Sequence, residues 1–342
     1  MKERKRYPLP LRAGAFLLAL LLFAALTWGA AWLLMPQRKE YGALWEQYLQ
    51  EPEDSIDVLF FGSSITYCDV APAWIWEESG LRSWVLAGPE QTLPLTYYYA
   101  REALKTQSPR LLVLEGTGLF FRRYQSYSKA NVSTMPFSLN RLGATLFGAE
   151  RAEWKGLLFP LYNYHYRWTE VREEELREHL TPEKDAFAGY MPLSRAIPQE
   201  IRLNRDRTME RADYEESLNW LAKLQRFCLE RGVPLLLYLS PSAARTDPAL
   251  CSRVAADAER LGIEFLDLSE LGETLGVDDD RDWYDPLHFN SSGAEKFSRW
   301  WGRTLLDRGL VPVGEDRTSW QERLDALNAR VEAMNEEETS AG

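Results

Sequence analysis

The chain has 342 residues, of which 45% are hydrophobic and 27% are charged, and this is the composition of an ordinary globular protein. Its formal net charge is −11, and no block rich in Lys and Arg follows residue 40, which excludes a basic surface for nucleic acid. Three cysteines and three histidines are too few for a disulfide framework or a zinc cluster. We expect buried free thiols, with a Cys228–Cys251 bridge as the alternative.

An uncharged apolar stretch near the N-terminus runs from Ala13 to Met35. It is long enough for a helix to cross the roughly 30 Å hydrocarbon core of a bilayer. Basic residues precede it, so the positive-inside rule predicts a cytoplasmic N-terminus and an exported remainder. These basic residues are Lys2, Arg4, Lys5, Arg6 and Arg12. A cleaved signal peptide is the alternative, but its apolar core would be shorter, roughly 7–15 residues, and bulky Trp28 and Trp32 crowd its cleavage region.

From residue 56 onward, short apolar runs alternate with longer helical patterns. The runs mostly end at Gly or Ser-Pro, as buried strands do. This alternation predicts an α/β fold with a parallel sheet that is covered on both faces. The predicted strands are 57–61, 84–87, 111–115, 234–239 and 263–266. The predicted helices are 93–105, 214–231, 248–261 and 293–308.

Residues 120–212 interrupt the alternation and are rich in aromatic and charged side chains. We interpret them as an insertion after the third strand, at a sheet edge where insertions usually build the site. The C-terminal stretch carries an apolar stripe at near-heptad spacing, which predicts an amphipathic helix that packs on the domain or binds a partner. The predicted organisation is a basic segment (1–12), a transmembrane helix (13–35), a stalk (36–55), the main domain (56–312), and the C-terminal helix with a polar tail (313–342).

A serine-bearing turn directly follows the first predicted strand. Gly62-Ser63-Ser64 comes after the apolar run, so Ser64 is expected above the carboxyl edge of the sheet. A serine hydroxyl needs a neighbouring base to become a nucleophile, and the N–H groups of such a turn are suited to bind an oxyanion. Alone, the pattern is more typical of an ordinary turn.

An acid and a histidine lie three residues apart just before the last predicted helix. Asp285 can accept a hydrogen bond from one imidazole nitrogen of His288, which leaves the other nitrogen to face a serine. His288 and Ser64 are 224 positions apart, but both map to the same rim of a doubly wound sheet. The pair therefore completes a candidate Ser-His-Asp triad.

Together these blocks resemble the SGNH/GDSL hydrolase superfamily. Gly62-Ser63-Ser64-Ile65-Thr66 stands for the first block, with Ser64 as nucleophile and Ser63 in place of the usual aspartate. Val85-Leu86-Ala87-Gly88 resembles the second block, and Asp285 with His288 resembles the fifth. The resemblance implies a three-layer α/β/α flavodoxin-like fold, with the N–H groups of Ser64 and Gly88 in the oxyanion hole.

The third block departs from the family pattern. Where Gly-x-Asn-Asp is expected after the third strand, the chain reads Glu115-Gly116-Thr117-Gly118, so the asparagine donor is missing. Thr117 is one candidate for its place, and Asn163 from the insertion is the other. Loss of such a donor typically lowers the rate by ~10²–10³.

Several other features have two interpretations. An aromatic cluster in the insertion, made of Tyr162, Tyr164, Tyr166 and Trp168, suits either stacking on sugar rings or hydrophobic filling. His165 lacks a carboxylate at fixed spacing, and Cys68 lacks a basic neighbour, so neither is favoured as a catalytic group. Asn131 and Asn290 begin glycosylation sequons that we interpret as chance matches.

Within the superfamily, the chain resembles the anchored, exported proteins that transfer D-alanine to teichoic acid or O-acetylate polysaccharides. The resemblance implies a serine esterase or O-acyltransferase that acts on acyl esters of a cell-envelope or extracellular polysaccharide, next to a membrane-bound O-acyltransferase. This chemistry calls for no metal or organic cofactor. The alternatives are a non-catalytic scaffold for that acyltransferase, favoured by the missing asparagine, and a lipase or thioesterase.

Overall fold

The computed structural model describes residues 8–36, 45–181, 184–204, 211–312 and 317–341. The chain divides into two compact units. Unit 1 comprises Met1–Gln37 with Arg151–Pro182, and unit 2 comprises Arg38–Glu150 with Glu183–Gly342. The predicted insertion at 120–212 is therefore not one body, because its middle part belongs with the N-terminal helix. Residues 1–7 of the predicted basic segment and 37–44 of the predicted stalk lie outside the described residues.

The core of unit 2 is a parallel sheet, which confirms the predicted α/β fold class. Its five strands have the order β2-β1-β3-β5-β7, and every neighbouring pair is parallel. The strands are β1 (Val58–Phe61), β2 (Ser83–Val85), β3 (Leu111–Glu115), β5 (Leu235–Leu239) and β7 (Glu264–Asp267). All five predicted strands are present, and their ends agree with the prediction to within two residues. A separate pair joins β4 (Arg202–Leu203) to β6 (Ala244–Arg245).

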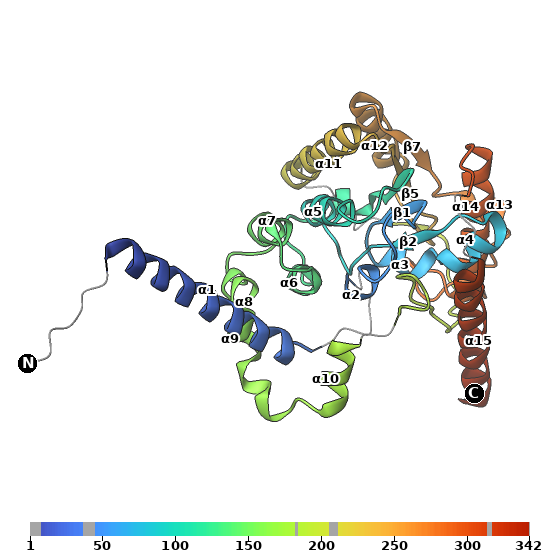
Figure 1. Ribbon diagram of the computed structural model, residues 1–342. Coiled ribbons are helices and arrows are strands. Elements are labelled where there is room, and N and C mark those ends of the chain that lie inside the picture. The colour runs from blue at the N-terminus through green and yellow to red at the C-terminus, as the bar shows by residue number, and fades with distance from the viewer. Residues whose placement is uncertain (1–7, 37–44, 182–183, 205–210, 313–316, 342) are drawn as a thin grey trace, which may run out of the picture. The chain divides into compact units, whose positions relative to one another are not determined.

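Helices cover both faces of this sheet, and the layers can be followed in Figure 1. One layer holds α3 (Ser64–Asp69), α4 (Pro72–Ser79) and α14 (Ser291–Asp307), which contact one another. The other holds α5 (Leu93–Ala103), α7 (Leu139–Gly148) and α11 (Arg211–Arg231), with α12 (Pro248–Leu261) beside β7. Strands β1, β2, β3 and β5 are completely buried, and their sequences are accordingly mostly apolar, whereas the edge strand β7 is partly exposed.

The buried aromatic side chains of α4 and α14 fill the first interface. Trp301 packs edge to face on Phe60 of β1 and on Tyr238 of β5, at ring-centroid distances of 5.5 and 5.1 Å. Trp74 of α4 and Trp301 of α14 are almost completely buried. Aromatic side chains bury more area than other residues, so this layer holds β1 firmly against the helices.

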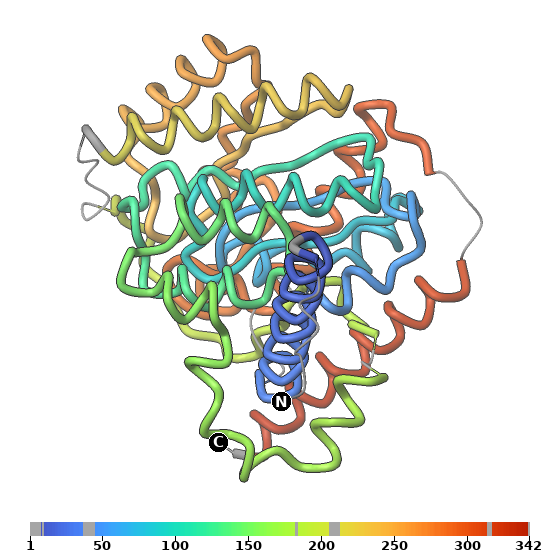
Figure 2. The backbone as a smooth tube through the Cα atoms, turned by 60° about the vertical axis from the view of Figure 1, so that its left-hand side comes forward, coloured from blue at the N-terminus to red at the C-terminus, as the bar shows by residue number. Residues whose placement is uncertain are grey.

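The remaining helices of unit 2 are short, with one exception. They are α2 (Trp45–Tyr48), η1 (Gly116–Phe120), α6 (Ser128–Thr134) and α13 (Leu271–Leu275). The exception is α15 (Arg317–Ala341), the long red helix of Figure 2, which contacts α4 through the apolar stripe seen in the sequence. Its Leu324 and Leu327 are buried in the core, and Trp74 Nε1 donates to Asn328 Oδ1 at 3.1 Å. The stripe thus packs on its own domain.

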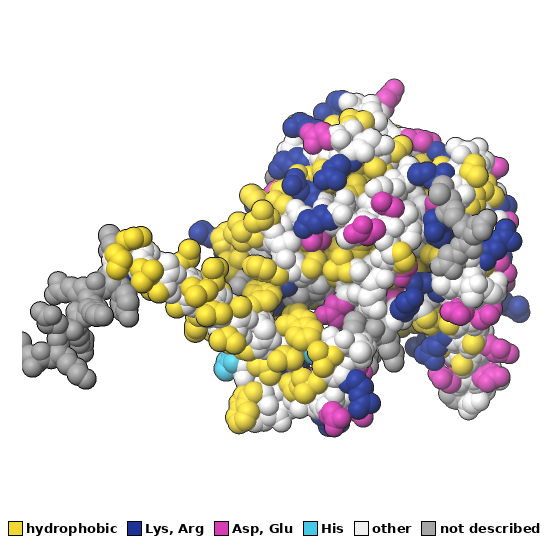
Figure 3. All heavy atoms as spheres, in the orientation of Figure 1, with side chains coloured by type: hydrophobic (Ala, Val, Ile, Leu, Met, Phe, Trp, Pro, Cys, Tyr) yellow, Lys and Arg dark blue, Asp and Glu magenta, His cyan; other side chains and the backbone are white. Residues whose placement is uncertain are grey.

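Unit 1 is built around one long apolar helix, α1 (Leu9–Leu34). Over Pro10–Leu34 its mean hydropathy reaches 2.2, and this helix is long and apolar enough to cross a membrane. Four short helices from the insertion complete the unit, namely α8 (Trp154–Leu158), α9 (Pro160–Tyr164), η2 (His165–Thr169) and α10 (Glu173–Leu180). Hydrophobic side chains, yellow in Figure 3, run along the exposed length of α1.

Candidate active site

The serine-bearing turn between β1 and α3 depends on a glycine. A Cβ atom on Gly62 would lie 2.0 Å from Thr66 Oγ1 and 2.8 Å from Glu115 Cβ, so any side chain here would displace the turn. Gly62 ends the strand, and Ser64 becomes the first residue of α3. The N–H of a first helical residue has no acceptor within the helix, which leaves that of Ser64 oriented for an oxyanion. We call residues 62–66 the nucleophile turn.

The acid and the histidine lie on a second turn, residues 283–289, which we call the acid–base turn. An antiparallel bridge joins Trp283 to Phe289, and their rings stack with centroids 4.3 Å apart. Tyr284 N–H donates to the carbonyl of His288 at 3.0 Å. Asp285 Oδ1 accepts the N–H groups of Leu287 and His288 at 2.7 and 3.0 Å. The Asp285 carboxylate thus stabilises the turn through Oδ1 and contacts the imidazole of His288 through Oδ2 as well.

The two turns bring Ser64, His288 and Asp285 together in hydrogen-bonding geometry. His288 Nε2 lies 2.8 Å from Ser64 Oγ, and His288 Nδ1 lies 2.8 Å from Asp285 Oδ2. Partial burial alone would raise the pKa of Asp285, but the hydrogen bond and charge of His288, with the N–H groups of the turn, outweigh it and hold this pKa below its usual value. Asp285 is therefore ionised at neutral pH and favours the tautomer with the proton on Nδ1.

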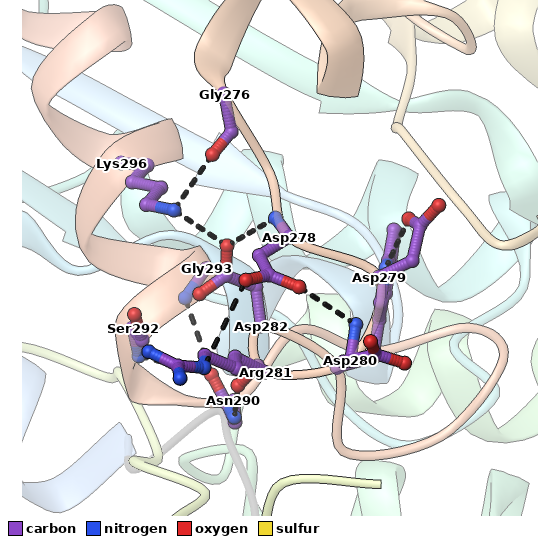
Figure 4. A network of polar contacts seen from close by, with 11 residues as sticks. Gly276, Asp278, Asp279, Asp280, Arg281, Asp282, Asn290, Ser292, Gly293 and Lys296 are labelled. Carbon is purple, nitrogen blue, oxygen red and sulfur yellow. Dashed lines mark hydrogen bonds and ion pairs between the residues drawn. The ribbon is translucent and has the colours of Figure 1, made fainter. Parts of the chain in front are cut away.

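A network of polar contacts on both sides of the acid–base turn holds it to α14 (Figure 4). Lys296 Nζ donates to Asp282 Oδ2 at 2.6 Å and to the carbonyl of Gly276 at 2.7 Å. Asp282 Oδ2 also accepts the N–H of Asp278 at 2.6 Å. Asn290 caps α14 by accepting from the N–H groups of Ser292 and Gly293 at 3.0 and 3.2 Å. The loop that carries His288 is therefore fixed at both ends.

One buried carboxyl group connects the two turns. Asp69, the last residue of α3, accepts the N–H of Phe289 through Oδ1 at 3.0 Å. Complete burial, aided by the charges of Asp285 and Glu115 and only partly opposed by that N–H, holds the pKa of Asp69 well above its usual value. This contact was not predicted, because it joins residues 220 positions apart.

On the second strand's side, the predicted oxyanion residue Gly88 lies against an asparagine that the sequence analysis did not select. A Cβ on Gly88 would lie 2.5 Å from Asn131 Oδ1, so only glycine allows this approach. Asn131 comes from α6 and is completely buried. Its Nδ2 donates to the carbonyl of Pro89 at 2.8 Å, and Tyr99 Oη donates to its carbonyl at 2.8 Å. One of the two amide hydrogens remains for a further acceptor.

The two residues predicted to replace the missing family asparagine have other partners. Thr117 donates both its N–H and its hydroxyl to Glu115 Oε1, at 3.0 and 2.6 Å, so its donors are already used. Asn163 lies on α9 in unit 1, where a Cβ on Gly156 would lie 2.3 Å from its Nδ2. The described contact of Asn163 is thus with α8, and neither residue has a described contact with the triad.

The other candidates also have clear positions. All three cysteines are free and buried, as expected. Complete burial, with the nearby charges of Asp69 and Asp285, holds the pKa of Cys68 well above that of a free thiol, which disfavours a thiolate nucleophile. His165 lies on the exposed surface of unit 1, with Nδ1 at 3.1 Å from the Tyr162 carbonyl. Asn131 and Asn290 are both buried, so neither sequon is accessible in the folded chain.

The solved structures similar to this chain include two crystal structures. One, from Bacteroides fragilis NCTC 9343, is described as a "putative acylhydrolase"; it is 13% identical, and the match covers 77% of this chain and 94% of that one, with a TM-score of 0.37. The other is a GDSL-like lipase from Bacteroides thetaiotaomicron VPI-5482, 11% identical over 78% of this chain and 96% of that one, also with a TM-score of 0.37. No family model and no curated protein matches the sequence.

The chemistry of the site therefore has to be inferred from its contacts. A serine hydroxyl, an imidazole and an ionised carboxylate form a continuous hydrogen-bonded chain at the carboxyl edge of the sheet. Ser64 follows β1 and Thr117 follows β3, so the site lies where the strand order reverses, which is the usual ligand position in open α/β sheets. Such an arrangement can transfer a proton from the hydroxyl as the oxygen attacks a carbonyl carbon.

Proposed function

We propose that this protein is a membrane-anchored serine esterase or O-acyltransferase of the SGNH type. The observation that carries the proposal is the 2.8 Å contact between Ser64 Oγ and His288 Nε2, with Asp285 on the other imidazole nitrogen. Nucleophile, base and orienting acid have the mutual geometry that serine catalysis requires. The two turns that carry them are fixed by buried contacts, so the arrangement does not depend on a ligand.

The reaction would proceed in two halves. Ser64 Oγ attacks the acyl carbonyl carbon while its proton passes to His288 Nε2, and the oxyanion accepts the N–H groups of Ser64 and Gly88. The intermediate then expels the alcohol, which takes the proton from His288 and leaves an acyl ester on Ser64. In the second half His288 takes a proton from water, giving an esterase, or from a sugar hydroxyl, giving a transferase. The incoming oxygen attacks the acyl carbon, and Ser64 regains its proton. No metal ion enters either half.

The substrate class follows from the anchor and from the family resemblance. With α1 across the membrane and the N-terminus in the cytoplasm, unit 2 would work outside the cytoplasm. Acyl esters of cell-envelope or extracellular polysaccharide are the substrates available there to an anchored enzyme. A membrane-bound O-acyltransferase that supplies acyl groups is the partner that the transferase reaction would require.

Labelling with a fluorophosphonate and turnover of p-nitrophenyl acetate by the full-length protein test the proposal. Ser64→Ala and His288→Ala should abolish both signals. Ser63→Ala is the matched control, because Ser63 is the adjacent serine and is buried, so both signals should persist. Labelling without turnover would favour a transferase that waits for its acceptor. Loss of labelling in Ser63→Ala but not in Ser64→Ala would contradict the assignment of the nucleophile.

We further propose Asn131 as the third oxyanion donor, in place of the Thr117 and Asn163 considered from the sequence. The atom of Asn131 nearest to Gly88 is its amide oxygen Oδ1, and its Nδ2 keeps one hydrogen beyond the one donated to Pro89, whereas both donors of Thr117 are used by Glu115. Asn131→Ala should lower kcat/KM by ~10²–10³, the usual effect of losing such a donor. Thr117→Val should change it much less. Equal losses in the two variants, with unchanged melting temperatures, would refute the assignment.

The second candidate function is a non-catalytic scaffold for a membrane acyltransferase. It is favoured by the Glu115 contact that occupies Thr117, because the position of the family's third block then offers no donor. A wild-type protein that is folded but neither labelled nor active would support this candidate. A wild type that is labelled at Ser64 would exclude it.

A further inference from the structure

Residues 151–181, which we call the collar, pack around the C-terminal end of α1. The N-terminal segment, which ends at Gln37, and the segment that begins at Arg151 together make up unit 1, although 114 positions separate these two residues in the sequence. Helix α9 and η2 of the collar both contact α1. Along α1 the side chains from Leu11 to Leu26 are exposed, whereas Ala31 is only 2% exposed. The collar therefore covers the last turns of the helix and leaves the rest bare.

The collar also binds the free carbonyl groups at the end of α1. Arg167 Nη1 donates to the carbonyl of Leu34 at 2.7 Å, and His179 Nε2 lies 3.0 Å from that of Met35. The ring of His179 lies against that of Trp32, with centroids 4.8 Å apart. The last carbonyls of a helix lack intrahelical donors, and a cation at this end is favoured by the helix dipole. Near a bilayer, unsatisfied carbonyls are costly, so these contacts suit a helix end at a membrane surface.

The length of α1 places these contacts at the edge of a bilayer. Its 26 residues rise about 1.5 Å each, or roughly 39 Å in all, which exceeds the roughly 30 Å hydrocarbon core. The surplus corresponds to about six residues. The turns that the collar covers, from Trp28 to Leu34, are of this length and lie at the end away from the basic N-terminal segment.

Several large hydrophobic side chains of the collar are exposed, beside exposed charged residues such as Glu173 and Arg177. Trp168 is 74% exposed and Leu180 is 72% exposed. The other large exposed hydrophobic side chains of the collar are Phe159, Tyr162, Tyr166 and Leu176. Lys155 Nζ lies 3.9 Å from the ring centre of Tyr162, so a cation accompanies the aromatic surface. Tyr, Trp and a nearby Lys are the residues that concentrate at the headgroup level of membranes.

We propose that the collar is a membrane-binding surface, with its exposed aromatic and leucine side chains inserted among the lipid headgroups around the outer end of α1. The proposal rests on the proposed membrane-spanning role of α1. It assigns the aromatic cluster to lipid, where the sequence had suggested sugar stacking or hydrophobic filling. The collar contacts α1 directly, and the exposed surface of α1 is apolar. A bilayer that surrounds α1 would therefore also contact the exposed apolar side chains of the collar.

Nitroxide labels on the full-length protein in phosphatidylcholine nanodiscs test this proposal. Because all three native cysteines are buried, the wild type serves as the background. Single cysteines replace Trp168 and Leu180 on the collar, and Leu21 on α1. Glu174→Cys is the matched control, because Glu174 is an exposed residue of α10 in the collar itself. Leu229→Cys, on an exposed leucine of α11, gives the aqueous baseline. Fluorophosphonate labelling of each variant checks that unit 2 remains folded.

Each label is compared for access to oxygen, which concentrates in lipid, and to a water-soluble nickel chelate. Trp168→Cys and Leu180→Cys should show a several-fold higher oxygen-to-nickel ratio than Leu229→Cys, while Glu174→Cys matches that baseline. Ratios at the baseline for Trp168→Cys and Leu180→Cys, with Leu21→Cys in lipid, would overturn the collar proposal and leave the anchor intact. An aqueous Leu21→Cys would overturn the anchor as well. Protection of the collar labels from both reagents would indicate protein contact and would also overturn the proposal.

Discussion

The nucleophile turn and the acid–base turn meet at one hydrogen bond but are held in place by different physical means. Around Gly62 the side chains of Thr66 and Glu115 approach so closely that no side chain fits. The acid–base turn instead depends on several polar contacts, among them the Asp282–Lys296 ion pair and the cap by Asn290. A turn held by steric exclusion should fail when a single methyl group is added, whereas a turn held by many contacts should lose function in steps.

The largest effect is expected where the acid–base turn meets the imidazole. Asp285→Asn keeps the size of the side chain but removes the charge, so His288 loses the partner that fixes its tautomer. We expect kcat to fall by about 10⁴ with a small change in KM. Steady-state kinetics of the wild type and the variant on p-nitrophenyl acetate measures kcat and KM. A loss below about tenfold would mean that Asp285 does not orient His288.

The charge of Asp285 also gives this variant a stability signature. Its pKa is lowered in the folded state, so the carboxylate stabilises the fold above the unfolded pKa of about 3.9, and this contribution disappears as the pH falls through the folded pKa. Melting temperatures of the wild type and Asp285→Asn should therefore converge on acidification below about pH 4. A gap that stays constant between pH 7 and pH 3 would contradict the lowered pKa.

Gly62→Ala tests the nucleophile turn. The added methyl group would lie 2.0 Å from Thr66 Oγ1, so the turn must shift and carry Ser64 away from His288. A displacement of this kind costs on the order of 10² in kcat/KM. Gly272→Ala is the control, because the nearest atom to its added Cβ is 3.7 Å away. Rates and fluorophosphonate labelling of the two variants are compared, and equal rates would refute steric control.

Lys296→Met tests whether the acid–base turn loses function in steps. The change removes one partner of buried Asp282, but the N–H of Asp278 still donates to that carboxylate. Lys296 is partly exposed, so we expect a loss of about 1–3 kcal/mol of stability and less than a tenfold fall in kcat/KM. Lys105→Met removes an ion pair of the same length, 2.6 Å, with buried Glu102 on α5. If Lys296→Met lowered kcat/KM as much as Gly62→Ala does, the two turns would not differ in how they respond to a single substitution.

The smallest effect on activity is expected at Asp69, which joins the turns. Asp69→Asn keeps an oxygen that accepts the Phe289 N–H, so kcat/KM should stay within a few-fold of wild type. Because the folded pKa of Asp69 is raised, its favourable contribution is complete below the unfolded pKa and is lost as pH rises through the folded value. Melting curves from pH 4 to pH 9 should show that the melting temperature of Asp69→Asn increases relative to that of the wild type as the pH rises. A constant difference would show that Asp69 ionises normally.

Much of unit 2 was predictable because its signals are local. Each strand is a continuous apolar run that ends near a turn residue, and α12 begins and ends at the predicted residues because Asp247 caps one end and Gly262 the other. The alignment of Ser64 with His288 also followed from strand order, since parallel strands end at one rim.

The remaining features depend on contacts that a single sequence does not display. Asn131 lies in the predicted insertion without any catalytic motif around it, and only the fold brings it against Gly88. Asp69 was missed for the same reason, because its hydrogen bond with Phe289 joins residues 220 positions apart. The division of the insertion was missed because the polar contacts of the collar with α1 include two backbone carbonyls, which have no sequence signature. Helix α4 was missed as well, since its eight residues are too few for a clear period.

The collar's contacts with α1 also set an order of events during synthesis. The hydrogen bonds to the carbonyls of Leu34 and Met35 come from residues 133 and 144 positions later in the chain. At about 5–20 residues per second, a ribosome needs roughly 7–30 s to make that interval. The carbonyls at the end of α1 therefore lack these two donors while β1 to β3 are already emerging. On the proposal that α1 is a membrane anchor, nascent chains that stop before Arg167 should have an anchor whose outer end is unprotected, and membrane-bound quality control would act on the protein during this interval.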